Sequence, residues 1–157
     1  MKDVVLILDN IRSVHNVGSI FRTAETAGVV KIYCLGTTPT PLDRFSLKRK
    51  DFAKVALGAE DLVPWEYLEA GEVLLKKLKK DGFYIVALEQ DAKSVNYRKI
   101  KCGKKVALIV GNEVGGVSGS LLKLSDEIAE IPMQGKKESL NVAVATGIML
   151  YSLHEKG

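Results

Sequence analysis

The feature that most constrains the fold of this chain is its C-terminal third, residues 106–157. Two short strand-like runs, residues 106–110 and 127–131, are each followed by a loop rich in glycine and polar residues. The segment closes with a helix, residues 140–154, whose apolar side chains point in nearly every direction. Short buried strands that lead into polar loops and helices are typical of α/β proteins with parallel strands.

The sequence upstream continues this alternation, and 157 residues suit one domain. Strands are expected at residues 4–8, 29–35, 63–67 and 83–88, and helices up to residue 27 and at residues 46–57, 69–80 and 118–124. Residues 36–45 and 91–105 are expected to be connecting segments. The predicted fold class is α/β, with a mostly parallel sheet covered by helices on both faces.

The composition narrows the class of protein. Hydrophobic residues make up 46% of the chain, which argues against disorder. No apolar run is long enough to span a membrane and residues 1–8 lack a signal-peptide pattern, so we expect a cytoplasmic protein without a membrane partner. The two cysteines, Cys34 and Cys102, are too few for a disulfide scaffold and lack metal-ligand spacing. No metal site is predicted, and Cys34 is expected in the core.

The net charge of +4 permits a polyanionic partner without establishing one. The basic residues fall into three clusters, within residues 44–54, 76–80 and 98–105. A solvated surface is the simpler interpretation of any single cluster. Together the clusters are compatible with binding to RNA or DNA.

Two loops at predicted strand ends carry polar residues, where α/β proteins bind ligands. The first, residues 111–116, has the sequence GNEVGG. It lacks the spacing of a dinucleotide-binding or phosphate-binding loop, and Glu113 would repel a pyrophosphate. A neutral or cationic ligand therefore fits better, although a simple tight turn is the structural alternative. A third candidate, residues 88–90, is weak by itself.

The second loop, residues 131–141, precedes the closing helix. Pro132 removes a backbone donor and Gly135 permits a sharp turn. Ser139 could cap the helix, or Ser139 and Asn141 could face a ligand, and the sequence leaves both readings open.

Near the N-terminus, Asn16, Gly18, Ser19 and Arg22 group around the start of the first helix. A surface ion pair with Glu25 is the simpler interpretation of Arg22. His15 is expected to be a polar loop residue rather than a catalyst.

The closing helix bears on the oligomeric state. A helix that is apolar on every face should be buried on every face. The sheet of a 157-residue chain covers only one side of it. A second copy of the chain is the natural cover for the other side, so a homodimer is predicted.

Three motifs in this chain together resemble a known family. They are NxGxxxR at residues 16–22, IVGNEVGGVS at residues 109–118 and IPMxGxxxSLNVAVA at residues 131–145. In order and spacing they are similar to the motifs of the SpoU (TrmH-like) branch of the SPOUT RNA methyltransferases. The resemblance implies transfer of a methyl group from S-adenosyl-L-methionine to a ribose 2′-hydroxyl of tRNA or rRNA. It also implies a homodimer and a C-terminal trefoil knot that holds the cofactor, an exception to the general absence of knots.

The resemblance also assigns roles to individual residues. The catalytic set that it implies is Asn16, Arg22, Glu113, Ser139 and Asn141. The cofactor-binding positions that it implies are Leu88, Gly111, Ile131, Met133 and Leu140, which act largely through backbone groups. The family mechanism makes the arginine a proton acceptor, which is unusual because guanidinium stays protonated in proteins. Arg22 could therefore act as base, or it could stabilise a developing alkoxide and hold the adjacent phosphate.

Residues 1–157 are expected to form a single catalytic domain without a separate RNA-binding extension. RNA contacts would then fall to the domain surface, with residues 98–105 as a further candidate region, or to a partner protein. The predicted RNA-binding residues are Arg44, Lys48, Arg49, Lys50 and Lys54. The alternative function is a catalytically silent RNA-binding dimer. A nucleotide-binding oxidoreductase is disfavoured because the dinucleotide fingerprint is absent.

Overall fold

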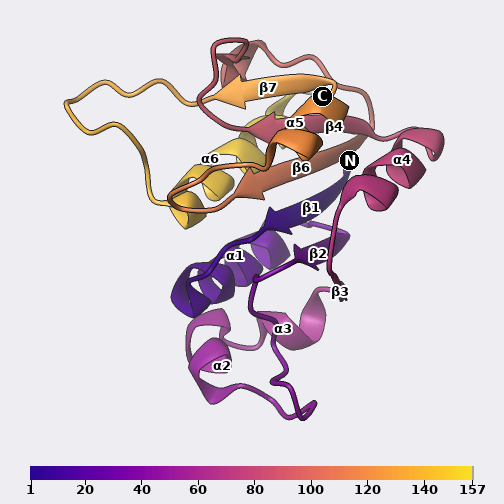
Figure 1. The fold of residues 1–157 in the computed structure, drawn as a ribbon, viewed down its shortest axis with the longest axis vertical. Helices are drawn as coiled ribbons and strands as arrows, with labels where there is room; N and C mark the ends of the chain where they lie inside the picture. Colours follow the sequence, from indigo (N-terminus) through magenta and orange to yellow (C-terminus); the bar gives the residue numbers. More distant parts are fainter. Residues whose placement is uncertain (157) are drawn as a thin grey trace.

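The structure, a computed structural model, describes residues 1–156 and is built around one seven-stranded sheet (Figure 1). The strand order is β3-β2-β1-β6-β4-β7-β5, and all the strand pairs are parallel. The strands are β1 (Asp3–Asp9), β2 (Lys31–Leu35), β3 (Trp65–Leu68), β4 (Tyr84–Leu88), β5 (Val95–Asn96), β6 (Lys105–Gly111) and β7 (Glu127–Glu130). The predicted parallel sheet is confirmed.

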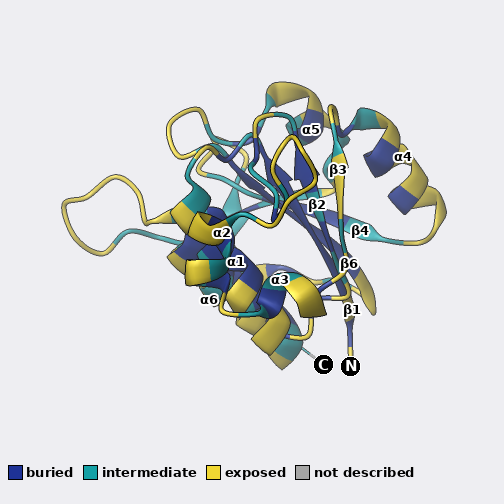
Figure 2. Ribbon diagram, turned by 90° about the horizontal axis from the view of Figure 1, so that it is seen from below, coloured by how far each residue is buried: buried dark blue, intermediate teal, exposed yellow. Residues whose placement is uncertain are grey.

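Helices cover both faces of the sheet (Figure 2). One face carries α1 (Val14–Thr26), α2 (Lys50–Ala56), α3 (Ala59–Leu62) and α6 (Val142–Glu155). The other face carries α4 (Glu72–Lys80) and α5 (Gly119–Leu124), and a 3₁₀ turn, η1 (Tyr97–Lys99), follows β5. The two-sided α/β architecture predicted from the sequence is confirmed.

The central strands explain why the sequence pattern was so apolar. In β1, Leu6 and Leu8 pack into the core under α1 and α6, whereas Val5 and Ile7 pack into the core under α4 and α5. Alternate side chains of a strand point to opposite faces, so a strand covered on both sides needs apolar residues at every position. Strand β6 pairs with β1 along its whole length and is buried in the same way.

Close packing of α1 against α2 fixes the surface on which Arg22 lies. The rings of Phe21 and Phe52 meet edge to face, with centroids 5.0 Å apart. A Cβ atom added at Gly18 would lie 3.0 Å from Cβ of Val55 and 3.2 Å from the backbone oxygen of Phe52. Glycine at this position therefore lets the two helices approach each other.

Helix α2 begins at Lys50, so the helix predicted over residues 46–57 was wrong in its first turn. Instead, the Asp43 carboxylate accepts hydrogen bonds from the backbone N–H groups of Phe45 and Leu47. Ser46 adopts a left-handed backbone conformation, with φ of 61°, which is incompatible with a continuing helix. A side chain that bonds nearby backbone groups competes with the helix in this way.

Three short elements among the described residues were not predicted. The two-residue strand β5, with the turn η1 after it, lies within the predicted connection at residues 91–105. The four-residue helix α3 follows α2 after a left-handed turn at Leu57 and Gly58. Elements this short carry too few residues to show a period.

Helix α6 is only half covered within this chain. Its buried side chains include Met149, Leu150 and Leu153, whereas Val144 is 52% exposed and Tyr151 is 49% exposed.

Within residues 1–156, no helix combines the length and the apolar character needed to cross a membrane. The knot expected from the family resemblance stays a prediction.

Candidate active site

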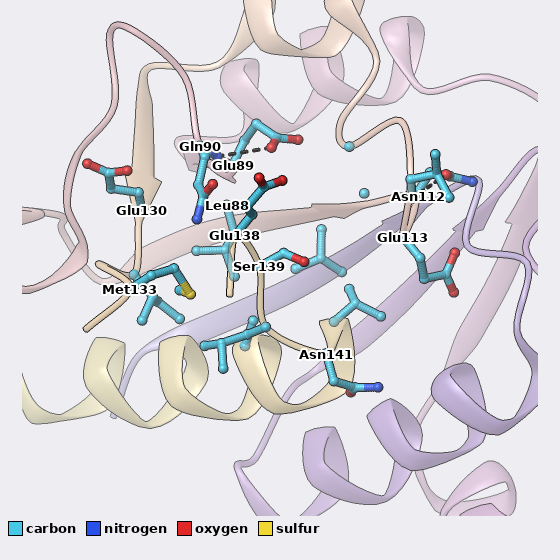
Figure 3. Close-up of a pocket in the computed structure, with 18 of the residues that line it drawn as sticks. Leu88, Glu89, Gln90, Asn112, Glu113, Glu130, Met133, Glu138, Ser139 and Asn141 are labelled. Carbon is cyan, nitrogen blue, oxygen red and sulfur yellow. Dashed lines mark hydrogen bonds between the residues drawn. The ribbon is translucent and has the colours of Figure 1, made fainter. Parts of the chain in front are cut away.

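A cavity of about 580 Å³ lies at the carboxyl edge of the sheet, beside the N-terminus of α6 (Figure 3). It is lined by residues that follow β4, β6 and β7, and by the loop that leads from β7 into α6. All the predicted catalytic and cofactor-binding residues except Arg22 line it. These are Asn16, Leu88, Gly111, Glu113, Ile131, Met133, Ser139, Leu140 and Asn141.

Hydrogen bonds join the three sequence motifs at the rim of the cavity. Asn141 Nδ2 donates to Asn16 Oδ1 at 3.1 Å, and Asn16 Nδ2 donates to Glu113 Oε1 at 3.2 Å. Asn16 lies on α1, Glu113 follows β6, and Asn141 starts α6. The fold therefore brings side chains that are about a hundred residues apart into one row.

The carboxylate of Glu113 is held in its charged form. Partial burial by itself would raise the pKa of Glu113, but hydrogen bonds from Asn16 and from backbone N–H groups hold that pKa below its usual value. The backbone donors include Arg12 N, at 3.3 Å from Oε2, and Ser13 N, at 3.4 Å from Oε1. Glu113 thus fastens the start of α1 to the loop after β6.

The glycines of the loop after β6 allow the backbone to fold back on itself. A Cβ atom at Gly111 would lie 2.3 Å from the carbonyl carbon of Gly116. Gly116 has φ of 70°, and a Cβ atom there would lie 1.8 Å from Glu89 Oε2. Glu89 Oε2 instead accepts a hydrogen bond from Val117 N at 2.7 Å. The loop after β6 is therefore a tight turn, as the structural alternative predicted, and it also lines the cavity.

The cap of α6 is Asn141 and not Ser139, which corrects one of the two readings of the sequence. Asn141 Oδ1 accepts from Ala143 N at 2.9 Å and from Val144 N at 3.2 Å. Ser139 is exposed, lines the cavity and forms no side-chain hydrogen bond among the described residues. Its hydroxyl is left free to meet a ligand.

The lining of the cavity is acidic. The described residues that line it include the carboxylates of Glu89, Glu113, Glu130 and Glu138, and none of them is a lysine, arginine or histidine. Figure 3 shows Glu89, Glu130 and Glu138 on the side of Leu88 and Met133, and Glu113 on the opposite side beside Asn112. Among the described residues, no group of three or more His, Cys, Asp or Glu side chains is placed to hold a metal ion. The electrostatic character favours a ligand with positive charge.

Sequence reasoning missed several of these lining residues. Glu89 belonged only to a weak candidate, while Asn112, Glu130 and Glu138 were not singled out. Asn112 shapes the loop, because its Nδ2 donates to Asn10 O at 2.7 Å and its Oδ1 accepts from Val114 N and Gly115 N. These four residues share one signal in the sequence. Each is a polar residue that lies within two positions of a predicted strand end or directly beside a motif residue.

Arg22 lies on a different surface of the chain. It lines a hollow between α1 and α2 together with His15, Ser19, Asp51 and Lys54. Among residues 1–156 Arg22 forms no salt bridge, so the proposed surface pair with Glu25 is not formed. A further hollow runs between α1 and α6 and shares residues with both sites, Asn16 and Asn141 with the cavity and His15 and Ser19 with the Arg22 hollow.

The predicted RNA-binding residues fall into two groups. Lys48 pairs with Asp61 at 3.0 Å, and Arg49 pairs with Asp51 at 2.8 Å. The others, Arg44, Lys50 and Lys54, are exposed and form no salt bridge among the described residues. The structure thus leaves three of these cations available to an anionic partner.

Comparison with known proteins gives consistent matches over nearly the whole chain. Residues 3–151 match the model of the SpoU rRNA Methylase family. A tRNA (guanosine(18)-2′-O)-methyltransferase of Aquifex aeolicus is 35% identical over 153 residues, covering 96% of this chain and 68% of that protein. A protein named as a TrmH family tRNA/rRNA methyltransferase in Staphylococcus saprophyticus is 32% identical, covering 97% of this chain and 58% of that protein.

A solved structure is also similar to this chain. The AdoMet-bound rRNA methyltransferase from Sinorhizobium meliloti superposes with a TM-score of 0.86 at 33% identity. The match covers 98% of this chain and 56% of that one. This chain therefore spans between about half and two thirds of the length of these relatives.

Proposed function

Because this chain belongs to the SpoU rRNA methylase family, we propose that it transfers the methyl group of S-adenosyl-L-methionine to a ribose 2′-hydroxyl of RNA. One observation carries the proposal beyond family membership. Side chains of all three motifs, Asn16, Glu113 and Asn141, meet through hydrogen bonds at the rim of one acid-lined cavity.

The residues of the cavity fit this cofactor. S-adenosyl-L-methionine carries a sulfonium and no phosphate, and supplies an activated methyl group when bound. An acidic lining without cations favours such a ligand over a nucleotide polyphosphate. Backbone groups of Leu88, Gly111, Ile131, Met133 and Leu140 would bind its adenine and ribose. The apolar side chains of Val110, Val142 and Ala145 offer a surface for the adenine ring.

Residues of this chain position the ribose hydroxyl and stabilise the charge that develops on it during methyl transfer. Transfer requires the hydroxyl to lie in line with the methyl–sulfur bond and to lose its proton. Asn16, Glu113 and Asn141 act as positioning residues, because their polar groups are already engaged with one another and with the backbone. Ser139 has a free hydroxyl that can hydrogen-bond the ribose. Arg22 stabilises the developing alkoxide and holds the adjacent phosphate.

A second copy of the chain would complete the site. Arg22 does not line the cavity of its own chain, and the exposed apolar residues of α6, Val144, Ile148 and Tyr151, lie on the neighbouring surface. Tyr151 Oη donates to Thr26 Oγ1 at 3.3 Å, so the outer faces of α6 and α1 form one surface. We propose a homodimer through this surface, in which Arg22 serves the cavity of the other copy.

The substrate class is tRNA or rRNA in the cytoplasm, with residues 1–157 acting as one catalytic domain. The name of the Aquifex relative specifies guanosine 18 of tRNA, and that position belongs to that protein. The contacts to phosphate would come from basic residues that form no salt bridge within residues 1–156, namely Arg22, Arg44, Lys50 and Lys54.

The direct test is methyl transfer to separated RNA classes. The protein would be incubated with methyl-labelled S-adenosyl-L-methionine and either unmodified tRNA or unmodified rRNA, and the RNA digested to nucleosides. We expect label in a 2′-O-methylated nucleoside from one of the two. Cofactor binding without transfer to either RNA would instead support the silent RNA-binding dimer, and label on a base would contradict ribose methylation.

A further inference from the structure

The segment between β2 and α2 carries an exposed aromatic side chain that the function described so far does not use. Residues 42 and 48 form an antiparallel bridge, and the turn between them holds Phe45 at 67% exposure and Leu47 at 63% exposure. Neither belongs to the two hydrophobic cores. An apolar ring held out in solvent costs free energy unless a partner covers it.

The turn holds the ring in place without help from the core. Asp43 Oδ1 accepts from Phe45 N at 2.8 Å and from Leu47 N at 3.0 Å, and Asp43 N donates to Leu47 O at 2.8 Å. Ser46 N donates to Asp43 O at 3.0 Å, and the φ of 61° at Ser46 is a conformation that non-glycine residues seldom adopt. Strained backbone of this kind clusters at ligand-binding sites.

A cation lies over the exposed ring. The Arg44 guanidinium carbon is 4.8 Å from the centroid of the Phe45 ring, and Arg44 forms no salt bridge among the described residues. Burial of this pair in an apolar protein interface would leave a desolvated charge without a counter-ion. An RNA nucleotide suits the pair better, because the base can stack on the ring and the phosphate can pair with the guanidinium.

Further cations lead from this turn toward Arg22. Lys50 and Lys54 lie four residues apart on α2 and therefore share one face of that helix. Lys54 lines the same hollow as Arg22. Hydrogen bonds fix both ends of the segment between β2 and α2. Thr37 N donates to Asn10 Oδ1 at 3.0 Å, and Arg49 N donates to Pro41 O at 2.9 Å. The turn and Arg22 are thus held at fixed positions around α2.

We propose that Phe45 and Arg44 form a stacking site for an unpaired base of the substrate RNA, outside the cofactor cavity. The phosphates that follow run along Lys50 and Lys54 to the ribose at Arg22. This proposal rests on the proposed function, because it assumes an RNA substrate. It specifies that the bound strand is unpaired where it crosses the turn.

The test measures binding of a fluorescently labelled single-stranded RNA 12-mer, and of the duplex of the same sequence, by anisotropy over a series of salt concentrations. Phe45→Ala should weaken single-strand binding about tenfold, as expected for one lost stacking contact, and leave duplex binding unchanged. Phe45→Tyr should restore the affinity. Leu47→Ala is the matched control, equally exposed in the same turn, and should change binding by less than about twofold.

The salt dependence separates stacking from charge. Phe45→Ala should leave the slope of log K against log salt unchanged, whereas Lys50→Ala should reduce it by about 0.7, the value for one phosphate of a single strand.

Native affinity in Phe45→Ala would overturn the proposal. An equal loss of affinity in Leu47→Ala would also overturn it and would indicate an apolar protein-binding patch. If the native protein methylates ribose and Phe45→Ala keeps both affinity and kcat/KM, this inference alone fails. If methyl transfer is absent from every RNA, the proposed function fails while the binding comparison still stands.

Discussion

The cavity at the ends of β4, β6 and β7 and the surface formed by α1 and α2 differ in charge and in how their polar groups are satisfied. The cavity is lined by four carboxylates, two of which, Glu89 and Glu113, are fixed by backbone donors. The α1–α2 surface presents Arg22, Lys50 and Lys54 without salt bridges among the described residues. A cationic small molecule suits the first region, and a polyanion suits the second.

The difference indicates separate ligands for the two surfaces, and Arg22 does not line the cavity of its own copy. At the cavity rim, the motif side chains are hydrogen-bonded to one another. The basic surface keeps its cations free for a partner. Changes on each surface should therefore have separate effects.

The largest effect is expected at Arg22. Arg22→Ala should lower turnover about a thousandfold, because a guanidinium that stabilises developing charge is lost. Binding of S-adenosyl-L-methionine, measured by calorimetry, should stay the same because Arg22 does not line the cavity. Lys76→Ala, which removes an exposed cation of α4 on the other face of the sheet, is the control and should keep most activity. Near-normal turnover of Arg22→Lys would exclude any role that needs a guanidinium.

The next effect is expected on the outer face of α6. Val144→Glu should convert the dimer to monomers in light scattering, because an unpaired carboxylate would be buried in the interface. Turnover should fall by about a hundredfold or more as the two surfaces separate. The matched control is Val73→Glu, an 81% exposed valine on α4 at the other face of the sheet. A Val144→Glu protein that stays dimeric would place the interface elsewhere.

A smaller effect is expected within the cavity. Glu138→Gln should weaken S-adenosyl-L-methionine about fivefold, the order expected for one solvent-accessible charge pair. It should leave S-adenosylhomocysteine unaffected, because the product has lost the sulfonium charge. Calorimetry with both ligands checks this difference. Equal weakening of the two would mean that Glu138 acts through shape rather than through charge.

The smallest effect concerns the pH dependence of stability. The pKa of Glu113 is lowered in the folded protein, so its stabilising contribution is present above the ordinary value of 4.5 and is lost as pH falls below it. The Tm of the native protein should therefore drop more steeply below pH 4.5 than the Tm of Glu113→Gln. Parallel curves for the two proteins would contradict the assignment of the hydrogen-bonded, charged carboxylate.

The sequence predicted the parts of the site that carry recognisable motifs. Asn16, Glu113 and Asn141 were expected together, and they meet at the cavity rim. The strands were found because successive residues such as Leu6 and Ile7 are apolar and are buried on opposite faces of the sheet. Each of these signals is local, since it depends on residue type and spacing along the chain.

The supporting contacts could not be predicted, because they join residues that are distant in sequence. Asp9 Oδ2 accepts hydrogen bonds from both the backbone N and the hydroxyl of Ser118, at 2.7 and 2.8 Å, across 109 residues. Glu89 holds Val117 in a similar way. In the sequence such carboxylates look like solvated strand ends.

The central claim is that the cavity of one copy works with Arg22 of the other, and mixed dimers test it most directly. One copy would carry Arg22→Ala, and the other would carry Ala145→Phe, which fills the cavity. Each homodimer should be inactive, with loss of cofactor binding checked for the second. Purified mixed dimers with two different tags should recover about half of the native turnover, because one site keeps both an open cavity and an arginine. Mixed dimers as inactive as the two parents would show that Arg22 acts within its own chain.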